Sequence, residues 1–317
     1  MRSIPFLLLL IACRAAAPAV RLPANPAPAV QRPSAGCGAA QGVVEGERRI
    51  TSSGRTRRFR LVLPDPLPPG PLPLVLNFHG LFEPPKLQQL VTGMDEEAGK
   101  RGMIVVYPEG VGLSWNAGSC CGRARAEQID DVRYARDLVR ELSRELCIDR
   151  NRVYATGLSN GALMSYRLAC EASDVFAAVA PVAGVEAVPA CKPRRAVPVL
   201  AFHGTKDLLV RWEGGWFDLG APRETVQRWR ERDRCSGPEE PLYQRGDARC
   251  TAARGCAADV ILCTIENGGH TWPGGIEAFF LGKTSRDLDA TRAILDFFLD
   301  HPYSPISSAM GLSASIR

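Results

Sequence analysis

The sequence has little of what several large classes of protein require. The apolar run near its N-terminus, residues 4–12, is too short to cross a bilayer. The formal net charge is only +5, and no dense basic block is interleaved with aromatic residues, so nucleic acid is not an expected partner. No H-E-x-x-H motif or clustered set of metal ligands occurs, so we predict no metal and no other cofactor. Internal repeats are also lacking.

The N-terminus has the pattern of an export signal, with Arg2 placed before the short apolar run. The stretch Leu10-Ile-Ala-Cys13 also resembles a bacterial lipobox, which would put a lipid on Cys13 and tether the protein to a membrane. Ordinary cleavage within residues 15–19 is the alternative. We therefore expect a secreted or extracytoplasmic protein with the following parts: export signal 1–13, alanine- and proline-rich linker 14–46, catalytic domain 47–301 and flexible tail 302–317.

Cysteine parity agrees with export. Of 11 cysteines, ten remain when Cys13 is set aside, an even number that predicts up to five disulfides and an oxidising compartment. Cys120 and Cys121 are adjacent, so each is expected to bond elsewhere rather than to its neighbour. The other pairings considered are Cys235 with Cys263 and Cys250 with Cys256.

Short apolar runs alternate with helical periodicity through the folded part of the chain. The runs are residues 74–78, 103–107, 152–156, 178–182, 197–202 and 260–265. Such runs are typical of a mostly parallel sheet with helices on both faces. The alternation therefore predicts a doubly wound α/β fold.

Four further segments have weaker or different patterns. Residues 130–147 predict an amphipathic helix, which Asp130 and Asp131 are expected to cap rather than to serve in catalysis. A closing helix is expected over residues 285–299. Residues 48–50 and 57–63 predict an antiparallel hairpin at one edge, and residues 209–258 an irregular, disulfide-pinned flap.

The motif Gly157-Leu-Ser-Asn-Gly161 lies between a strand-like run and a helix-like run. A serine on such a sharp turn has a strained backbone, and the residues two before and two after it must be nearly free of side chain. Ser159 is therefore the candidate nucleophile. Two other Gly-Leu-Ser triplets, at residues 112 and 311, lack the second glycine.

A serine hydroxyl needs a base to take its proton and an acid to orient that base. Only four histidines occur, and His270, in the glycine-rich loop 267–275 after a predicted strand, is the best candidate for the base. In α/β hydrolases the acid lies between nucleophile and base in the chain. Asp207 directly follows a predicted strand and is preferred to Glu213 and Asp218.

Attack of a serine hydroxyl on a carbonyl carbon forms a tetrahedral intermediate, whose negative oxygen needs two backbone N–H donors. We expect the amide of Asn160, which follows the nucleophile, and that of Leu81, in the turn after the first central strand, to form this oxyanion hole. Gly80 would allow the close backbone approach.

Six motifs in this order resemble the secreted esterase family of polyhydroxybutyrate depolymerases and feruloyl or acetylxylan esterases. They lie at residues 71–80, 114–122, 129–132, 157–161, 203–207 and 268–275. The resemblance covers roughly residues 60–301 and implies an α/β-hydrolase fold, an acyl-enzyme mechanism, and Ser159, Asp207 and His270 as nucleophile, acid and base. It also puts Trp115 and Trp272 where such enzymes line the substrate cleft.

The resemblance implies an ester substrate, either linked to plant polysaccharide or a polyester oligomer. Because no polymer-binding module follows the catalytic part, soluble or oligomeric esters are favoured over crystalline polymer. A serine peptidase of the same fold and a catalytically inactive binding protein are the alternatives. Labelling by a fluorophosphonate probe would separate an active hydrolase from a binding protein.

Overall fold

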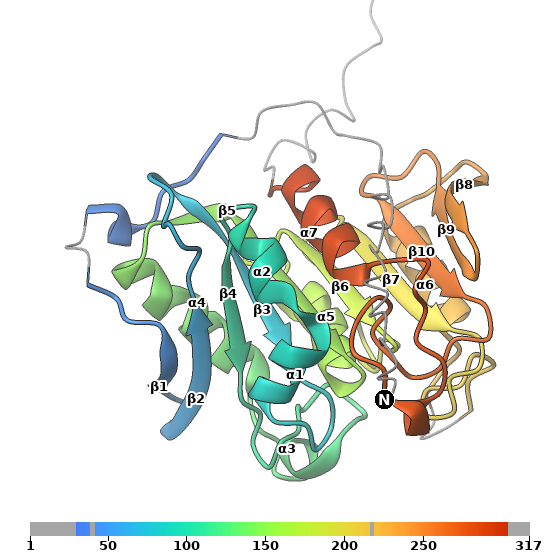
Figure 1. The fold of residues 1–317 in the computed structure, drawn as a ribbon, viewed down its shortest axis with the longest axis horizontal. Coiled ribbons are helices and arrows are strands. Elements are labelled where there is room, and N and C mark those ends of the chain that lie inside the picture. The colour runs from blue at the N-terminus through green and yellow to red at the C-terminus, as the bar shows by residue number, and fades with distance from the viewer. Residues whose placement is uncertain (1–29, 39–41, 216–218, 304–317) are drawn as a thin grey trace, which may run out of the picture.

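The computed structural model describes residues 30–38, 42–215 and 219–303. One sheet of ten strands runs through the molecule (Figure 1) in the order β1-β2-β4-β3-β5-β6-β7-β10-β9-β8. The strands are β1 Gly46–Ser52, β2 Arg55–Val62, β3 Leu72–Phe78, β4 Ile104–Pro108, β5 Ile148–Leu158, β6 Ala178–Val182, β7 Val199–Gly204, β8 Glu239–Arg245, β9 Ala248–Ala253 and β10 Val260–Ile265.

The six central strands are parallel and are the six that the apolar runs predicted. Every residue of β3, β4, β6 and β7 is buried, because helices cover both faces of this part of the sheet. The helices are α1 Pro85–Thr92, α2 Met94–Gly99, α3 Gly122–Ala126, α4 Asp131–Glu145, α5 Asn160–Glu171, α6 Pro222–Arg232 and α7 Ala290–Asp300, with 3-10 turns η1 Ala35–Gly38 and η2 Phe279–Leu281.

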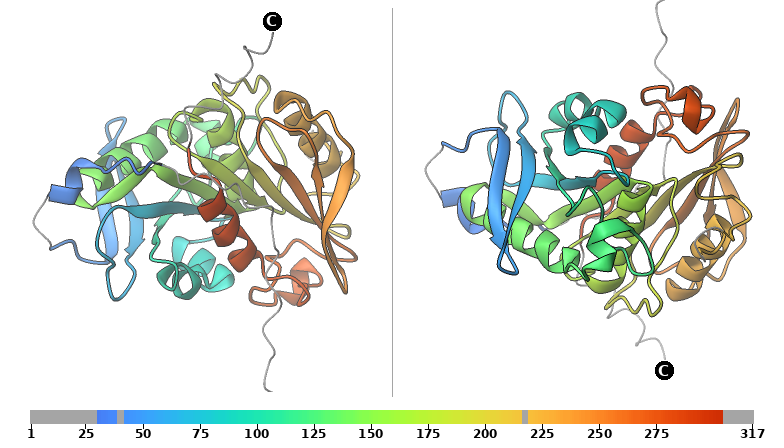
Figure 2. Two further views of the ribbon diagram at one scale, coloured as in Figure 1. Left: turned by 90° about the horizontal axis from the view of Figure 1, so that it is seen from above. Right: turned by 90° about the horizontal axis from the view of Figure 1, so that it is seen from below.

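Two apolar cores lie on opposite faces of the sheet. Helices α4, α5 and α6 pack on one face and helices α2 and α7 on the other, as the two views of Figure 2 show. The arrangement confirms the predicted α/β fold with helices on both faces. Within the described ranges, no helix is long and apolar enough to span a bilayer.

The predicted edge hairpin is present. Strands β1 and β2 pair in antiparallel register, and the two turn residues Ser53 and Gly54 both have positive φ, of 49° and 72°. This is the backbone of the two-residue turns that match strand twist. The hairpin joins the sheet through β2, which is antiparallel to β4.

The two aspartates expected to cap α4 have different roles. Asp130 is the N-cap, and its side chain accepts a hydrogen bond from the Arg133 amide at 2.8 Å. Asp131 is instead fully buried and pairs with Arg57 of β2 at 2.7 Å. It also accepts from the Asn116 amide at 2.8 Å, so it joins the edge hairpin to the 114–116 loop.

The predicted irregular flap has regular structure. Within residues 209–258 the chain forms α6 and the β8–β9 hairpin, which extends the sheet beyond β10 in antiparallel fashion. The sequence pattern missed these strands because β8 is largely exposed and lacks an apolar run. Disulfides do pin this region, as expected.

All ten cysteines of the described chain form disulfides, which confirms the predicted even pairing. The bonds are Cys37–Cys147, Cys120–Cys121, Cys170–Cys191, Cys235–Cys256 and Cys250–Cys263. The expectation that Cys120 and Cys121 bond elsewhere was wrong, since the two are paired across a cis peptide bond. The two other pairings considered were also wrong, because β9 and β10 bring Cys250 opposite Cys263. Cys13 lies outside the described residues.

Part of the predicted linker is bound to the domain. Ser34 accepts a hydrogen bond from the Ile148 amide at 2.9 Å and donates to the Leu146 carbonyl at 2.7 Å. The Cys37–Cys147 disulfide holds the same segment at the start of β5. The packed domain therefore begins before residue 47. The sequence prediction missed this segment because its composition does not show that Cys37 bonds to a cysteine 110 residues away.

Candidate active site

Ser159 occupies the turn between β5 and α5, where its backbone adopts φ 56° and ψ −119°. A non-glycine residue rarely adopts such a conformation, and it persists only where the surroundings enforce it. A Cβ added at Gly157 or at Gly161 would collide with the carbonyl oxygen of Phe78 at the end of the neighbouring β3. The flanking glycines are thus required by the close approach of β5 and α5 to the end of β3, in agreement with the predicted need for residues nearly free of side chain.

Asp207 and His270 meet at the same edge of the sheet, although 63 residues separate them. They follow β7 and β10, which are adjacent parallel strands. His270 Nδ1 lies 2.7 Å from Asp207 Oδ2, and both side chains are almost fully buried. The other carboxylate oxygen, Oδ1, accepts the amides of Leu209 and Val210, each at 2.8 Å. The carboxylate is therefore held in one orientation with Oδ2 facing the imidazole.

A second histidine, His203, approaches the same carboxylate oxygen that faces His270. Its Nε2 is 2.7 Å from the Val210 carbonyl oxygen and 3.5 Å from Asp207 Oδ2. Burial lowers the pKa of His203, so its ring is neutral and Nε2–H donates to the carbonyl. The negative charge of Asp207 is thus left for His270.

The turn after β3 orients the backbone N–H of Leu81. The Gly80 carbonyl oxygen lies 2.7 Å from His79 Nδ1 and accepts the Glu83 amide at 3.3 Å. In a trans peptide the carbonyl and the following N–H point in opposite directions. The Leu81 N–H therefore points away from these donors, and it has no acceptor within the described part of the chain.

His79 is a fixed, neutral part of this turn. Its Nε2 accepts the Gly110 amide at 3.0 Å, which requires the proton to be on Nδ1, facing the Gly80 carbonyl. Burial lowers the pKa of His79 to about 4. His79 is a positioning residue, a role that the sequence interpretation missed. The available signal was its place between a buried strand and Gly80.

The two tryptophans expected to line a cleft are buried, at 0% exposure for Trp115 and 1% for Trp272. This corrects the expectation that they face substrate. The Trp115 amide donates to Asn160 Oδ1 at 2.7 Å, and its indole N–H donates to the His79 carbonyl at 3.0 Å. Trp272 donates from its indole to Thr291 at 2.9 Å. Each indole N–H donates to a partner inside the protein. Both tryptophans therefore pack behind loops of the site and hold them in place.

Asn160 follows the nucleophile as the first residue of α5. Its side chain makes two hydrogen bonds with the Trp115 backbone, of 2.7 and 3.1 Å. Its own amide has no acceptor in the described chain, as expected at the start of a helix. The two amides predicted for an oxyanion hole, those of Leu81 and Asn160, are therefore both available.

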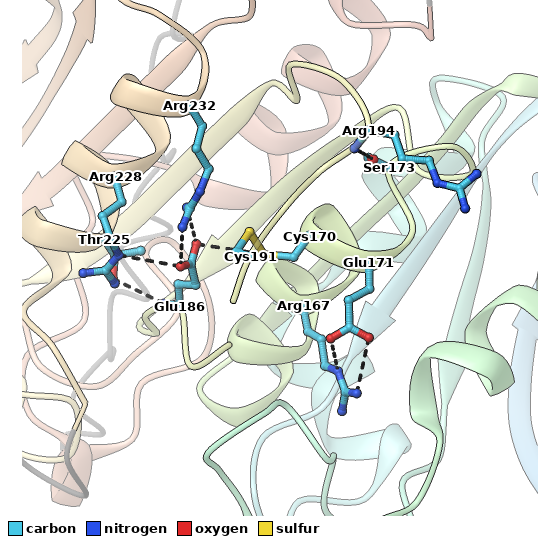
Figure 3. Close-up of a disulfide and its surroundings, with 10 residues drawn as sticks. All are labelled: Arg167, Cys170, Glu171, Ser173, Glu186, Cys191, Arg194, Thr225, Arg228 and Arg232. Carbon is cyan, nitrogen blue, oxygen red and sulfur yellow. Dashed lines mark hydrogen bonds and ion pairs between the residues drawn. A yellow bond between two sulfur atoms is a disulfide. The ribbon is translucent and has the colours of Figure 1, made fainter. Parts of the chain in front are cut away.

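A cluster of possible metal ligands occurs away from this edge. Cys170, Glu186 and Cys191 have ligand atoms within 4.8 Å of one another. Figure 3 shows why they do not fit a metal: the two sulfurs are bonded together, and Glu186 is paired with Arg232 at 2.6 Å. Arg228 also approaches Glu186 at 3.6 Å. The carboxylate thus serves to join the loop after β6 to α6.

Comparison with known proteins extends these observations. Residues 96–194, under half of the chain, match the Prolyl oligopeptidase family. The chain is 32% identical over 283 residues to the putative esterase NocK of Nocardia uniformis subsp. tsuyamanensis, an alignment covering 80% of this chain and 82% of that protein. The chain belongs to the α/β-hydrolase esterase family. It is a carboxylic ester hydrolase.

Two other similarities concern a curated relative and a solved structure. The esterase is 33% identical over 217 residues to feruloyl esterase B of Piromyces equi, covering 62% of this chain but only 39% of that protein. It thus spans less than half of that relative. The structure of an acetyl xylan esterase from Aspergillus awamori aligns with a TM-score of 0.53 at 16% identity, covering 71% of this chain and 94% of that one, and so shows a shared fold.

Proposed function

We propose that this esterase is an extracytoplasmic serine hydrolase of carboxylic esters, with Ser159, His270 and Asp207 as its catalytic triad. The observation that carries the proposal is the 2.7 Å bond between His270 and Asp207, at the sheet edge where the strained Ser159 turn also lies. The Ser159 hydroxyl attacks the ester carbonyl carbon while His270 takes its proton. The alcohol then leaves with that proton, and an acyl-enzyme remains.

Water completes the reaction. His270 takes a proton from water, the resulting hydroxide equivalent attacks the acyl carbon, and Ser159 regains its proton as the carboxylic acid leaves. Asp207 stabilises the imidazolium in both steps. The Leu81 and Asn160 amides would donate to the oxyanion, an interaction that contributes about 10²- to 10³-fold in rate for each donor.

The substrate proposed is an ester of the feruloyl or acetylxylan type, or a hydroxyalkanoate oligomer. The names of the similar proteins support the first two, and the resemblance in sequence supports the third. The five disulfides support an oxidising compartment outside the cytoplasm. A lipid tether on Cys13 remains a proposal, and mass spectrometry of the mature N-terminus would test it.

Fluorophosphonate labelling tests the triad directly. The intact protein should become labelled at Ser159, and Ser159→Ala should abolish both labelling and ester turnover. A panel of methyl ferulate, acetylated xylan, 4-nitrophenyl esters and hydroxybutyrate oligomers then ranks the substrates. Retained turnover in Ser159→Ala would contradict the proposal, and an unlabelled, inactive wild-type protein would favour a binding role.

A serine peptidase is the second candidate, because residues 96–194 match the Prolyl oligopeptidase family. The same triad can cleave an amide, whose leaving group is poorer than that of an ester. Matched ester and amide substrates with one acyl group would separate the two activities. We expect hydrolysis of the ester and little hydrolysis of the amide.

A further inference from the structure

Glu83 is an acidic residue beside the proposed catalytic centre that the mechanism above does not use. Its Oε2 accepts the Gly80 amide at 2.8 Å. A Cβ built at Gly80 would lie 2.8 Å from that oxygen and 3.7 Å from the Ser159 Cβ, so both atoms border the same point. The carboxylate oxygen and the Ser159 side chain thus border the same turn after β3.

Among the residues that the structure describes, no lysine, arginine or histidine lies within ion-pair distance of Glu83, whereas Glu109 and Asp247 each have such a partner. Burial raises the pKa of Glu83, while the Gly80 amide and the nearby charge of His270 act in the opposite direction. The side chain is half-buried.

We propose that Glu83 is a specificity-determining residue that admits uncharged esters and rejects esters carrying a carboxylate near the scissile bond. This inference rests on the proposed function of Ser159. Two carboxylates brought together at low solvent exposure repel each other strongly, since little water remains to screen them.

The same repulsion acts on the product. Hydrolysis of the acyl-enzyme produces a carboxylic acid beside Ser159, and this acid loses its proton at neutral pH. Glu83 then disfavours rebinding of the product anion. Weak inhibition by product is therefore a second consequence of the same residue.

Glu83→Gln is the informative variant, because the glutamine oxygen can still accept the Gly80 amide while the charge is removed. The matched control is Glu96→Gln, which removes the same charge from an exposed position on α2. The substrates are 4-nitrophenyl methyl glutarate, which is neutral, and 4-nitrophenyl hydrogen glutarate, which carries a carboxylate. Glutarate monomethyl ester serves as the product anion.

In Glu83→Gln the ratio of kcat/KM for the neutral ester to that for the anionic ester should fall on the order of tenfold. The inhibition constant of the product anion should fall by a similar factor. Glu96→Gln should change neither. An unchanged ratio in Glu83→Gln, or an equal loss for both esters, would overturn the proposal, because a disturbed loop affects both alike. Failure of the triad would appear separately, as turnover retained in Ser159→Ala.

Discussion

At the scale of single residues, the polar atoms of the site already have fixed hydrogen-bond partners. Asp207 uses one oxygen for two backbone amides and the other for His270. His79 fixes the Gly80 carbonyl and so the direction of the Leu81 N–H. These arrangements need no rearrangement when charge develops during the reaction, which is the condition for efficient electrostatic stabilisation.

Asp207→Asn should lower kcat by about 10⁴-fold, because the amide cannot hold the imidazole in the required tautomer. The substitution is nearly isosteric, and Oδ1 can still accept its two backbone amides. The thermal unfolding midpoint should therefore change little. Steady-state kinetics and a thermal melt of the same preparation measure both quantities, and turnover close to wild type would show that another acid orients His270.

Trp115→Phe should lower kcat more than it changes KM. The substitution keeps most of the buried ring but removes the indole N–H that donates to the His79 carbonyl. The lost bond leaves a buried carbonyl without this donor and should cost about 1 kcal/mol of unfolding free energy. Trp272→Phe, which removes a similar bond to Thr291, is the control. Equal effects of the two variants on kcat would argue against a role of Trp115 in positioning the turn after β3.

At the scale of elements, adjacent parallel strands bring the chemistry together. Ser159, Asp207 and His270 follow β5, β7 and β10, and the turn with Leu81 follows β3. Parallel strands end at the same edge of a sheet, so residues distant in sequence meet there. Periodicity predicted these four strands, and also β4 and β6, because each is a buried apolar run. It missed the β8–β9 hairpin, whose outer strand is exposed.

Asp130→Ala should lower the unfolding free energy by about 1 kcal/mol, since it removes the side-chain acceptor for the Arg133 amide at the start of α4. Asp130→Asn retains an acceptor and should lose less. Denaturant unfolding of the three proteins measures the difference. Because the Asp130 side chain is exposed and bonds to the first turn of its own helix, kcat should be unaffected; a large loss of kcat in Asp130→Ala would instead indicate a catalytic role.

At the scale of the whole molecule, a buried ionisable group can lower the stability of the folded protein. Asp233 is fully buried, its Oδ1 accepts the Val197 amide at 3.2 Å, and its Oδ2 has no partner in the described chain. Burial raises its pKa from 3.8 to about 7. Between those values the unfolded chain loses a proton that the folded chain retains, so this group makes stability fall as pH rises from about 4 to 7.

Asp233→Asn should remove that dependence. The variant should gain stability relative to wild type as pH rises from 4 to 7, by on the order of a few kcal/mol at most. Denaturant unfolding at several pH values measures the difference between the two proteins. A difference that stays constant across this range would show that the Asp233 pKa is not raised in the folded protein.

The Cys37–Cys147 disulfide should contribute about 2–4 kcal/mol to the unfolding free energy, because it closes a loop of 110 residues in the unfolded chain. The double variant Cys37→Ala, Cys147→Ala should lose this contribution while keeping the triad. Urea unfolding under oxidising conditions tests this expectation. Loss of turnover without loss of stability would mean that the N-terminal segment acts on the site itself.

The sequence by itself determined the buried parallel strands, the sharp turn at Ser159 and the proposal of Asp207 and His270 as partners, because those features depend on local pattern, steric demand and chain order. Only the tertiary structure decided the disulfide partners, the burial of Trp115 and Trp272, and the position of Glu83 on the same turn that Ser159 borders. Each of these depends on which distant segments become neighbours. The local composition of a segment does not identify the distant residue that strand pairing will place opposite it.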